Sequence, residues 1–226
     1  MRVLIFDTET TGLPSSKIIN PDTLKLWPHT VQFSYVVYDT ETNNIMDLHN
    51  SIIKVAEGIN IPEESIKFHG ITNEISQECG IEIELVLIEF FYQLKSVDKI
   101  IGHNVSFDIN MVKVELLRII YSRKQTTEFK NYLHFINNAK NICCTLQDSI
   151  ELCNIKALDK YGKEYLKFPK LIELHQKLFN SDPNNLHNSL NDILVTLRCF
   201  MKMKYDFDVN ENCDQFKKIA LDIKLF

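Results

Sequence analysis

The chain opens with an uninterrupted apolar segment that runs directly into two carboxylates. Residues 2–7 are Arg-Val-Leu-Ile-Phe-Asp, with no polar residue alternating among the apolar ones, and Glu9 lies two positions beyond Asp7. A run of this kind is typical of a central strand covered on both faces. The segment 10–14, which contains Gly and Pro, indicates a turn that ends the strand. These residues predict a covered sheet with acidic groups at one end of its central strand.

The remaining patterns predict an antiparallel meander followed by alternating helices and strands. Residues 58–81 indicate loops with one short helix near 63–68, and the helix expected over 82–95 has Leu85, Ile88 and Phe91 or Tyr92 on one face. The other expected elements are strands over 31–38, 45–54, 99–101 and 141–145, helices over about 105–121, 170–179 and 189–204, and a final helix in the last twenty residues. This order predicts an α/β fold, a mixed sheet with helices on both faces.

Composition and charge narrow the classes of function. The chain has 45% hydrophobic residues, enough for a sizeable core, and a formal net charge of −5. A protein that clamps duplex nucleic acid by charge alone is usually basic, so a general DNA-coating protein is excluded. An acidic balance remains compatible with an enzyme whose carboxylates hold cations, because the cations reverse the local charge.

Cysteine spacing and the N-terminal segment indicate the compartment. The six cysteines include no C-x-x-C pair and no zinc spacing, which predicts reduced, mostly buried thiols. The N-terminal apolar run is too short for a signal peptide, and no segment approaches the roughly 20 apolar residues of a membrane span. We therefore expect a soluble intracellular protein, in the cytoplasm or nucleus, that is not secreted and has no membrane partner.

Asp7 and Glu9 are the first candidates for chemistry. Residues i and i+2 of a strand point to the same face, so these carboxylates project together and Thr8 points to the opposite face. Two adjacent carboxylates at the end of an apolar strand repel each other, and a divalent cation would remove that cost. The alternative is a pair of solvated acids at a strand end.

Asp108 is the next candidate. It follows a short apolar strand that breaks at Gly102, and Asn104 is expected to cap the helix that carries it. Asp108 then lies in the first helical turn, where the helix dipole favours an acid. Simple helix capping is the alternative role.

His187 and Asp192 are five residues apart, which corresponds to about 140° on a continuous helix, so they do not share a helical face. We therefore expect His187 in the loop after Pro183, with Asn188 or Ser189 capping the helix that carries Asp192. A mobile loop position suits a residue that swings in when substrate arrives. A plain surface histidine is the alternative.

Taken together and in this order, the motifs resemble the DEDDh exonucleases, the group with the DNA polymerase III epsilon proofreading subunit, RNase T and the TREX enzymes. The matching segments are FDTETTGL (6–13), HGIT (69–72), IGHNVSFD (101–108) and LHNSLNDILVT (186–196). The resemblance implies an RNase H-like mixed five-stranded sheet flanked by helices, an exonuclease domain over 1–204, and a tail, 205–226, in the same domain. One departure is Ser189, where family members often carry Ala, a small change expected to face the same pocket.

The resemblance also implies a reaction. Oxygen-only ligands suit two divalent cations, Mg²⁺ or Mn²⁺, about 4 Å apart. Asp7 would bridge both cations, Glu9 and Asp192 would complete the first, and Asp108 would support the second. His187 would be the general base that takes a proton from the attacking water. The reaction would be 3′→5′ hydrolysis that releases nucleoside 5′-monophosphates.

Further residues are candidates for holding the substrate. By resemblance Leu13 and Pro14 would pack against the terminal bases, although a buried turn leucine is an equal alternative. His69 would lie near the 3′-terminal nucleotide, or else end a helix with Gly70 in the left-handed conformation. Phe107 would stack on a base or pack in the core. The full set is Thr8, Leu13, Pro14, His69, Asn104 and Phe107.

A lysine-rich segment and the identity of the substrate remain open. Residues 156–170 contain five lysines against two acids, which suits either contact with upstream phosphates or an ordinary solvated loop. The expected partner is a single-stranded or frayed 3′ end of DNA, in proofreading for a separate DNA polymerase or in end trimming. RNA 3′-end processing is the alternative. A non-catalytic nucleic-acid-binding accessory module is a further alternative, but none of the four acids is missing.

Overall fold

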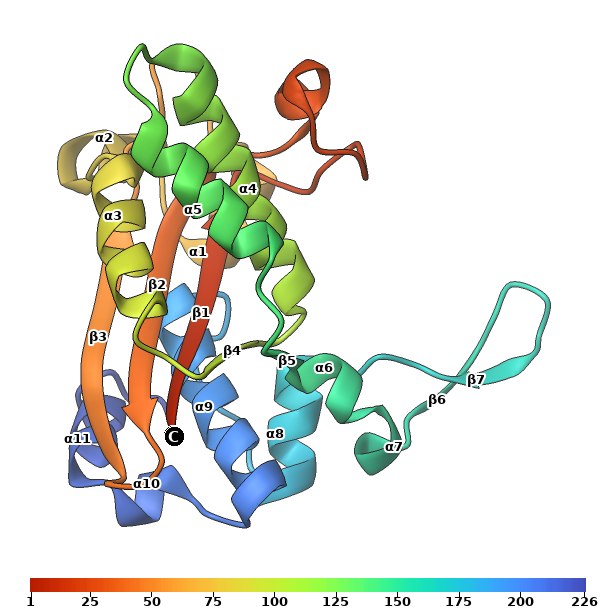
Figure 1. Ribbon diagram of the computed structural model, residues 1–226. Coiled ribbons are helices and arrows are strands. Elements are labelled where there is room, and N and C mark those ends of the chain that lie inside the picture. Colours follow the sequence, from red (N-terminus) through yellow and green to blue (C-terminus); the bar gives the residue numbers. More distant parts are fainter.

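Strand β1 (Arg2–Thr10) lies at the centre of a mixed five-stranded sheet with the order β3-β2-β1-β4-β5 (Figure 1). It pairs antiparallel with β2 on one side and parallel with β4 on the other. The other strands of this sheet are β2 (Thr30–Asp39), β3 (Asn44–Ile52), β4 (Lys99–Gly102) and β5 (Ile142–Cys144). The computed structural model describes all residues from 1 to 226, and it confirms the predicted mixed sheet and its central strand.

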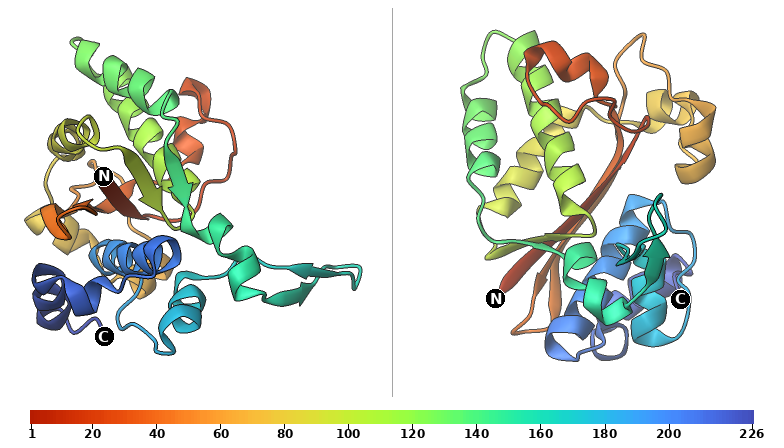
Figure 2. Two further views of the ribbon diagram at one scale, coloured as in Figure 1. Left: turned by 60° about the horizontal axis from the view of Figure 1, so that its bottom comes forward. Right: turned by 90° about the vertical axis from the view of Figure 1, so that its right-hand side faces the viewer.

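Helices cover both faces of the sheet because β1 is apolar on both sides. Leu4 and Phe6 belong to a core on one face, whereas Val3 and Ile5 belong to a second core on the other. The first core is covered by α3 (Ile83–Leu94), α4 (Val105–Ser122) and α5 (Thr127–Asn137), and the second by α8 (Leu171–Phe179), α9 (Ser189–Tyr205), α10 (Val209–Asn212) and α11 (Asp214–Asp222). Two views in Figure 2 show these layers from other sides.

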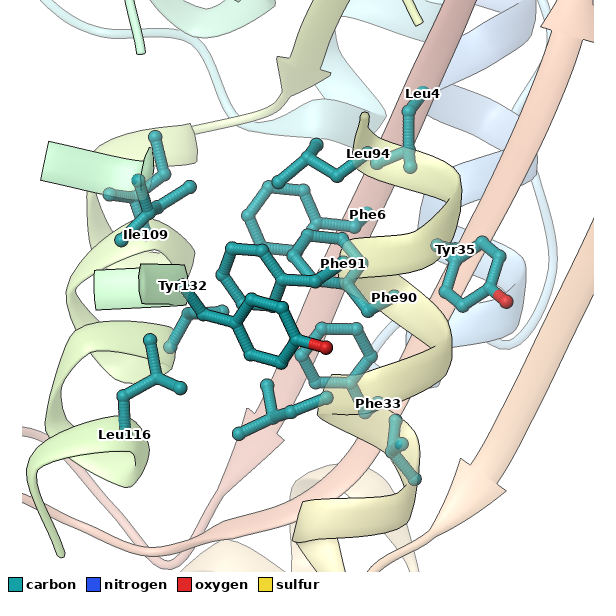
Figure 3. Packing of buried hydrophobic residues seen from close by; sticks show 14 of the residues in the cluster. Leu4, Phe6, Phe33, Tyr35, Phe90, Phe91, Leu94, Ile109, Leu116 and Tyr132 are labelled. Atoms are coloured by element: carbon teal, nitrogen blue, oxygen red, sulfur yellow. The ribbon is translucent and has the colours of Figure 1, made fainter. Parts of the chain in front are cut away.

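The first core is rich in aromatic rings, which fixes how α3 packs (Figure 3). Phe90 lies between Phe6 and Phe33, with ring centroids 5.0 and 5.1 Å away. The predicted buried face of α3 was wrong in part, because Leu85, Ile88 and Tyr92 point outward and only Phe91 of that set is buried. Helix α3 is apolar over most of its surface, so the spacing of its apolar residues is compatible with two different buried faces. Packing against Phe6 and Phe33 of the sheet selects the face that contains Phe90.

The C-terminal residues complete the second core. Phe216 of α11 and Leu225 are fully buried in the same cluster as α9. Arg198 of α9 forms an ion pair with Asp208 at 2.7 Å, and its guanidinium lies 4.3 Å from the centroid of the Phe226 ring. The last twenty residues are therefore packed against α9, and the expected final helix is present as α11.

Several elements differ from the expected set. Helix α1 (Glu63–His69) was expected, but α2 (Asn73–Cys79) and α5 were not. The lysine-rich segment forms a hairpin of β6 (Lys156–Leu158) and β7 (Glu164–Leu166), which projects from the body of the molecule (Figures 1 and 2). The remaining short helices are η1 (Pro21–Leu26), α6 (Thr145–Asp148) and α7 (Ile150–Cys153).

All six cysteines are free thiols, as expected, but only Cys143, Cys199 and Cys213 are buried. Cys79 is exposed, so the expectation of mostly buried thiols holds for half of them. None of the helices is both long enough and apolar enough to cross a membrane.

Candidate active site

Three carboxylates meet at the end of β1, on the face that α9 covers. Because Val3 and Ile5 contact the α9 core, the alternation of the strand points Asp7 and Glu9 to the same side. Asp192 lies in the first turn of α9. One carboxylate oxygen from each of Asp7, Glu9 and Asp192 can be chosen so that all lie within 4.8 Å of one another.

Burial and mutual repulsion disfavour the charged forms of this cluster. Burial raises the pKa of Asp7 to about 7. Burial, and then the charge of Asp7, raise the pKa of Glu9 to about 8. The pKa of Asp192 is also well above its usual range, because of burial and the charges of Asp7 and Glu9. Without a counter-charge, these carboxyl groups retain protons near neutral pH.

The donor set fits a hard divalent cation. The ligand atoms of the cluster are carboxylate oxygens alone, which is the chemistry that Mg²⁺ and Mn²⁺ prefer. Asp192 Oδ1 is buried and has no hydrogen-bond donor, while its Oδ2 accepts only from the backbone N–H of His187, at 3.3 Å. A buried carboxylate oxygen without a donor is costly, and a cation at this position would satisfy it.

Asp108 approaches the end of β1 from the other face. The side chain of Thr8 points toward α4, and both its hydroxyl and its backbone N–H donate to Asp108 Oδ1, at 2.8 and 3.0 Å. Burial, and then the charge of Asp7, raise the pKa of Asp108 well above its usual range. The structure therefore brings together the carboxylates of Asp7, Glu9 and Asp192 on one face of β1. The fourth predicted acid, Asp108, lies at the same end of β1 and is bonded to Thr8.

The start of α4 differs from the expected cap. The helix begins at Val105, directly after Asn104, as predicted. However, Asn104 has a left-handed backbone with a φ of 67°, and its side chain makes no capping hydrogen bond, so the predicted cap interaction was wrong. The carboxylate of Asp108 accepts from Thr8 of the neighbouring strand, which gives it a role beyond helix capping.

His187 lies outside α9, as its spacing from Asp192 predicted. Asn188 is the N-cap of this helix, and its side chain accepts from the backbone N–H of Leu190 at 3.1 Å. His187 itself is exposed and has a left-handed backbone with a φ of 70°. Its imidazole lies edge-on to the ring of Phe68, with centroids 5.6 Å apart. The backbone bond to Asp192 ties this loop to the carboxylate cluster.

A cavity of about 500 Å³ opens onto Asp7, Asp192 and His187. Asn104 also lines it, but the remaining lining residues were not predicted as parts of the site. These come from α1, the segment before α4, α6, and the stretch between the hairpin and α9: Phe68, His103, Leu146, Phe168, Pro169, Lys170, Leu171, Ile172 and Leu186. His103 and Leu186 lie inside two of the matched segments, 101–108 and 186–196, and Phe68 directly precedes a third, so their positions in the motifs were the signal that could have found them.

His103 fixes one wall of this cavity. Its Nε2 lies 3.0 Å from the carbonyl oxygen of Pro169, and its Nδ1 lies 3.0 Å from Thr145 Oγ1. Burial lowers the pKa of His103 to about 4, so the ring is neutral near pH 7. A neutral ring can donate from Nε2 to Pro169 and accept from Thr145 at Nδ1. The segment after the hairpin is thereby anchored to the end of β4.

The other predicted substrate residues lie outside the cavity. Leu13 is 86% exposed on the loop after β1, and Pro14 is half-buried beside it. His69 is buried at the end of α1, where its Nδ1 accepts from the backbone N–H of Ile71 and Gly70 adopts the left-handed conformation, as the alternative predicted.

Phe107 packs with buried Trp27 and Met111 in a small hydrophobic cluster that is separate from the two main cores. This agrees with the core-packing alternative. Trp27 also donates from its indole N–H to the carbonyl of Ile18 at 2.9 Å. Neither aromatic residue lines the cavity.

Ser189 does not face the cavity, contrary to expectation. It is fully buried, and its hydroxyl lies 2.6 Å from that of Ser34, which pairs opposite Asp7 in the sheet. The backbone N–H of Ser189 donates to Gln32 Oε1 at 3.2 Å. The added hydroxyl therefore joins the start of α9 to β2, on which α9 packs.

A family profile, RNase_T, described as exonuclease, matches residues 4–200. Comparison with curated protein sequences gives no match.

Similar solved structures include exonuclease I of Methylocaldum szegediense, at 17% identity and a TM-score of 0.55 over 93% of this chain and 42% of that one. E. coli exonuclease I in complex with a dT13 oligonucleotide has 17% identity and a TM-score of 0.58 over 91% of this chain and 42% of that one. A 3′-exonuclease described as recognising the 3′ end of a histone mRNA stem-loop has 14% identity and a TM-score of 0.57 over 94% of this chain and 65% of that one.

At these identities the likeness establishes a shared fold, the RNase H-like exonuclease fold that the motifs predicted. The chain spans less than half of the length of the exonuclease I structures. The match to the family profile extends over most of the chain and includes all the acids of the site. The chain therefore belongs to the RNase_T family of exonucleases.

Proposed function

We propose that this protein is a metal-dependent 3′→5′ exonuclease of the DEDDh type, which releases nucleoside 5′-monophosphates. The observation that carries the proposal is the convergence of carboxylate oxygens from Asp7, Glu9 and Asp192 within 4.8 Å, at the rim of a cavity that also contains His187. Membership of an exonuclease family supports the reaction class.

The four acids would hold the cations. Asp7, Glu9 and Asp192 form one oxygen cluster, and Asp108 lies next to Asp7 with its Oδ1 fixed by Thr8. Asp7 is central to both groups, since its charge affects the pKa of each of the other acids. Two divalent cations, Mg²⁺ or Mn²⁺, would there offset the carboxylate charge and polarise the scissile phosphate. Asp7 is accordingly the residue that would contact both.

His187 would act as general base toward the attacking water. It is not part of the oxygen cluster, and its ring makes no hydrogen bond that would hold it away from the cavity. Asp192 anchors the backbone of His187, so the loop delivers the imidazole next to the carboxylates. The edge of Phe68 limits where the ring can go, which favours one orientation when substrate enters.

The first candidate for the substrate is the single-stranded or frayed 3′ end of DNA. Exonuclease I from E. coli, which shares the fold, has been crystallised with a dT13 oligonucleotide. RNA 3′-end processing is the second candidate, because a 3′-exonuclease of similar fold recognises the 3′ end of a histone mRNA stem-loop. A DNA polymerase would be a separate partner in proofreading. A non-catalytic accessory module is disfavoured by the presence of all four acids.

We further assign residues 205–226 to the same domain as 1–204. The support is the complete burial of Phe216 and Leu225 in the core that α9 forms against the sheet. The backbone N–H of Asn184 also donates to the Leu225 carbonyl at 2.8 Å, which joins the C-terminus to the loop preceding His187.

The function is tested by digestion of 5′-labelled single-stranded DNA, duplex DNA with a mismatched 3′ end, and RNA, each with Mg²⁺. We expect nucleotide-by-nucleotide shortening of single-stranded DNA and faster trimming of the mismatched end than of a paired one. Asp7→Asn should show none of it. Equal digestion by Asp7→Asn would mean that a contaminating nuclease or another site is responsible, and inactivity of the parent protein on all three substrates would reject the proposal.

A further inference from the structure

The hairpin of β6 and β7, here called the arm (residues 155–167), projects from the body of the molecule with both faces uncovered (Figures 1 and 2). Its base is closed by the bond from the backbone N–H of Lys167 to the carbonyl of Ile155, at 2.9 Å. An isolated two-stranded hairpin is marginally stable in water. None of the residues 155–167 is buried in a core, so the surface of the arm is available to a binding partner.

The arm and its exit present aromatic rings to solvent. Tyr161 at the tip is 82% exposed, Tyr165 on β7 is 49% exposed, and Phe168 just beyond the arm is 60% exposed. None of these rings packs against another aromatic ring. Unsupported rings on a projecting element are suited to stacking on nucleic-acid bases, since every base offers a planar face.

The same segment carries positive charge in an acidic chain. Lys156 is paired with Glu164 at 2.9 Å, and Lys167 with Glu173 at 2.5 Å. Lys160, Lys163 and Lys170 form no ion pair. Three uncompensated ammonium groups close to exposed rings form a surface complementary to a phosphate backbone with unpaired bases.

The acid nearest the tip, Asp159, forms no ion pair with these lysines. Asp159 Oδ1 accepts from the backbone N–H groups of Tyr161 and Lys163, at 2.8 and 2.9 Å, and this shapes the turn. The ammonium of Lys160 lies 4.9 Å from the centroid of the Tyr161 ring.

The ring of Tyr165 and the charged side chain of Lys163 lie on the same face of the arm. Ala157 pairs opposite Tyr165 in the hairpin, so these two side chains point to one side. Lys163 directly precedes β7, and its carbonyl accepts from the backbone N–H of Asp159 at 2.9 Å, which continues the pairing by one residue and puts Lys163 on the side of Tyr165. The side chain opposite Tyr165 is therefore only a methyl group, which leaves room for a base over the tyrosine ring.

The arm leads directly into the wall of the active-site cavity. Phe168, Pro169 and Lys170 follow it and line the cavity together with Asp7 and Asp192. The hydrogen bond of His103 with the Pro169 carbonyl holds this exit in place, as does the ion pair between Lys167 and Glu173 of α8. A strand whose 3′ end occupies the cavity can thus continue along the arm without crossing the rest of the protein.

We propose that the arm binds the single-stranded part of the substrate upstream of its 3′ end, with bases stacked on Tyr161 and Tyr165 and phosphates beside Lys160 and Lys163. This inference rests on the proposed exonuclease function and specifies how that site takes long strands. The occupant is a flexible polynucleotide, because exposed rings alternate along the arm with lysines that form no ion pair.

The test measures binding and hydrolysis separately. Binding of 5′-fluorescein-labelled oligothymidylates of 20 and 3 nucleotides is followed by anisotropy in the Asp7→Asn background, which prevents digestion. Hydrolysis in the active protein is followed with the same oligomers and with the p-nitrophenyl ester of thymidine 5′-monophosphate, which is too short to reach the arm. One arm variant combines Tyr161→Ala with Tyr165→Ala, and the other combines Lys160→Ala with Lys163→Ala.

Matched controls make the same chemical changes elsewhere. Tyr92→Ala removes a ring that is 75% exposed on α3, and the pair Lys217→Ala and Lys218→Ala removes two exposed charges on α11. Neither site lines the cavity.

We expect the tyrosine pair to weaken binding of the 20-mer by about tenfold or more. The lysine pair should lower the slope of log affinity against log salt by about 0.7 for each phosphate that the variant no longer neutralises. Binding of the 3-mer and turnover of the nitrophenyl ester should stay within about twofold of the parent protein, and the controls should match the parent throughout.

Three outcomes overturn the inference. Arm variants that bind the 20-mer as the controls do show that the strand does not use the arm. Equal losses on the 20-mer and the ester show that the arm acts through the integrity of the site. Loss of a self-associated form on gel filtration with 20-mer binding intact shows that the arm holds a second copy. If the parent protein hydrolyses no substrate, the exonuclease proposal fails, and the binding data still report on the arm.

Discussion

Thr8 donates two hydrogen bonds to a single oxygen of Asp108, from its hydroxyl at 2.8 Å and from its backbone N–H at 3.0 Å. Asp7 and Glu9, the neighbours of Thr8 in sequence, point to the opposite face of the same strand, toward Asp192. One short strand end therefore organises three of the four acids, two directly and Asp108 through the residue between them, and it faces the fourth, Asp192 of α9.

Thr8→Val should weaken this arrangement without a change in side-chain shape. The buried Asp108 oxygen would lose its hydroxyl donor, which should lower the free energy of unfolding by about 1–3 kcal/mol. Loss of a residue that orients a metal ligand typically costs about 10–100-fold in activity or metal affinity. Urea unfolding and nuclease rates would check both, with Thr8→Ser as the control that keeps the hydroxyl. Equal activity in the valine and serine variants would contradict the role given to this hydrogen bond.

Without divalent cations, stability should fall with rising pH above about 6.5. The pKa values of Asp7 and Glu9 are raised to about 7 and about 8 from ordinary values of 3.8 and 4.5, so the folded protein holds these protons more tightly. Their stabilising contribution is complete below about pH 4 and is lost as the pH passes through 7 to 8.

Two partly buried histidines act in the opposite direction at lower pH, which sets the pH window for the measurement of Tm. Burial lowers the pKa of both His29 and His103 to about 4, so these rings favour the folded state increasingly up to about pH 6.5. Thermal unfolding in chelator should therefore show a Tm that declines between pH 6.5 and 8. Added Mn²⁺ should raise the Tm more at pH 8 than at pH 5. A Tm that rises through pH 8 in chelator would be inconsistent with the buried carboxylate cluster.

Asp7→Asn should abolish hydrolysis and at the same time stabilise the metal-free protein. The substitution removes the charge that raises the pKa of Glu9, Asp108 and Asp192. At pH 8 in chelator the Tm should be higher than that of the parent protein, and the gain should shrink at pH 5, where the carboxyls are protonated. Calorimetric titration with Mn²⁺ should show weaker binding and fewer sites. A variant with the parent's Mn²⁺ affinity would show that Asp7 is not a ligand.

His187→Ala should slow the reaction and leave metal binding nearly intact. A positioned general base typically contributes about 10²–10⁴-fold in rate, so kcat should fall by that order while substrate affinity changes little. Loss of Mn²⁺ binding in His187→Ala would instead make it a ligand, and an unchanged rate would remove it from the mechanism.

The local parts of this molecule could be predicted from the sequence, because their signals lie within a few residues. The unbroken apolar run before Asp7 indicated the central strand, and the five-residue offset between His187 and Asp192 separated the loop from the helix. The hydrogen bonds between Thr8 and Asp108 join residues 100 positions apart, so they could not be predicted from a local pattern. The sequence predicted only that the side chain of Thr8 points to the face opposite those of Asp7 and Glu9.

The parts that depend on tertiary packing were not predictable in the same way. Helix α3 has two apolar faces, and the choice between them depended on the rings of Phe6 and Phe33 on the sheet. The strands of the arm are three residues each, too short to show a period, and their composition resembles that of a solvated loop. Pro169, which lines the cavity, is held by a hydrogen bond with His103, 66 residues earlier in the chain. No local sequence pattern could therefore predict this part of the cavity.

Metal-dependent digestion from the 3′ end is tested most simply by the time course of digestion of a 5′-labelled single strand with Mg²⁺ and with excess chelator. We expect a ladder of labelled products that shortens one nucleotide at a time from the 3′ end, with unlabelled 5′-mononucleotides released and no digestion in chelator. A labelled mononucleotide as the earliest product, or undiminished digestion in chelator, would contradict this expectation.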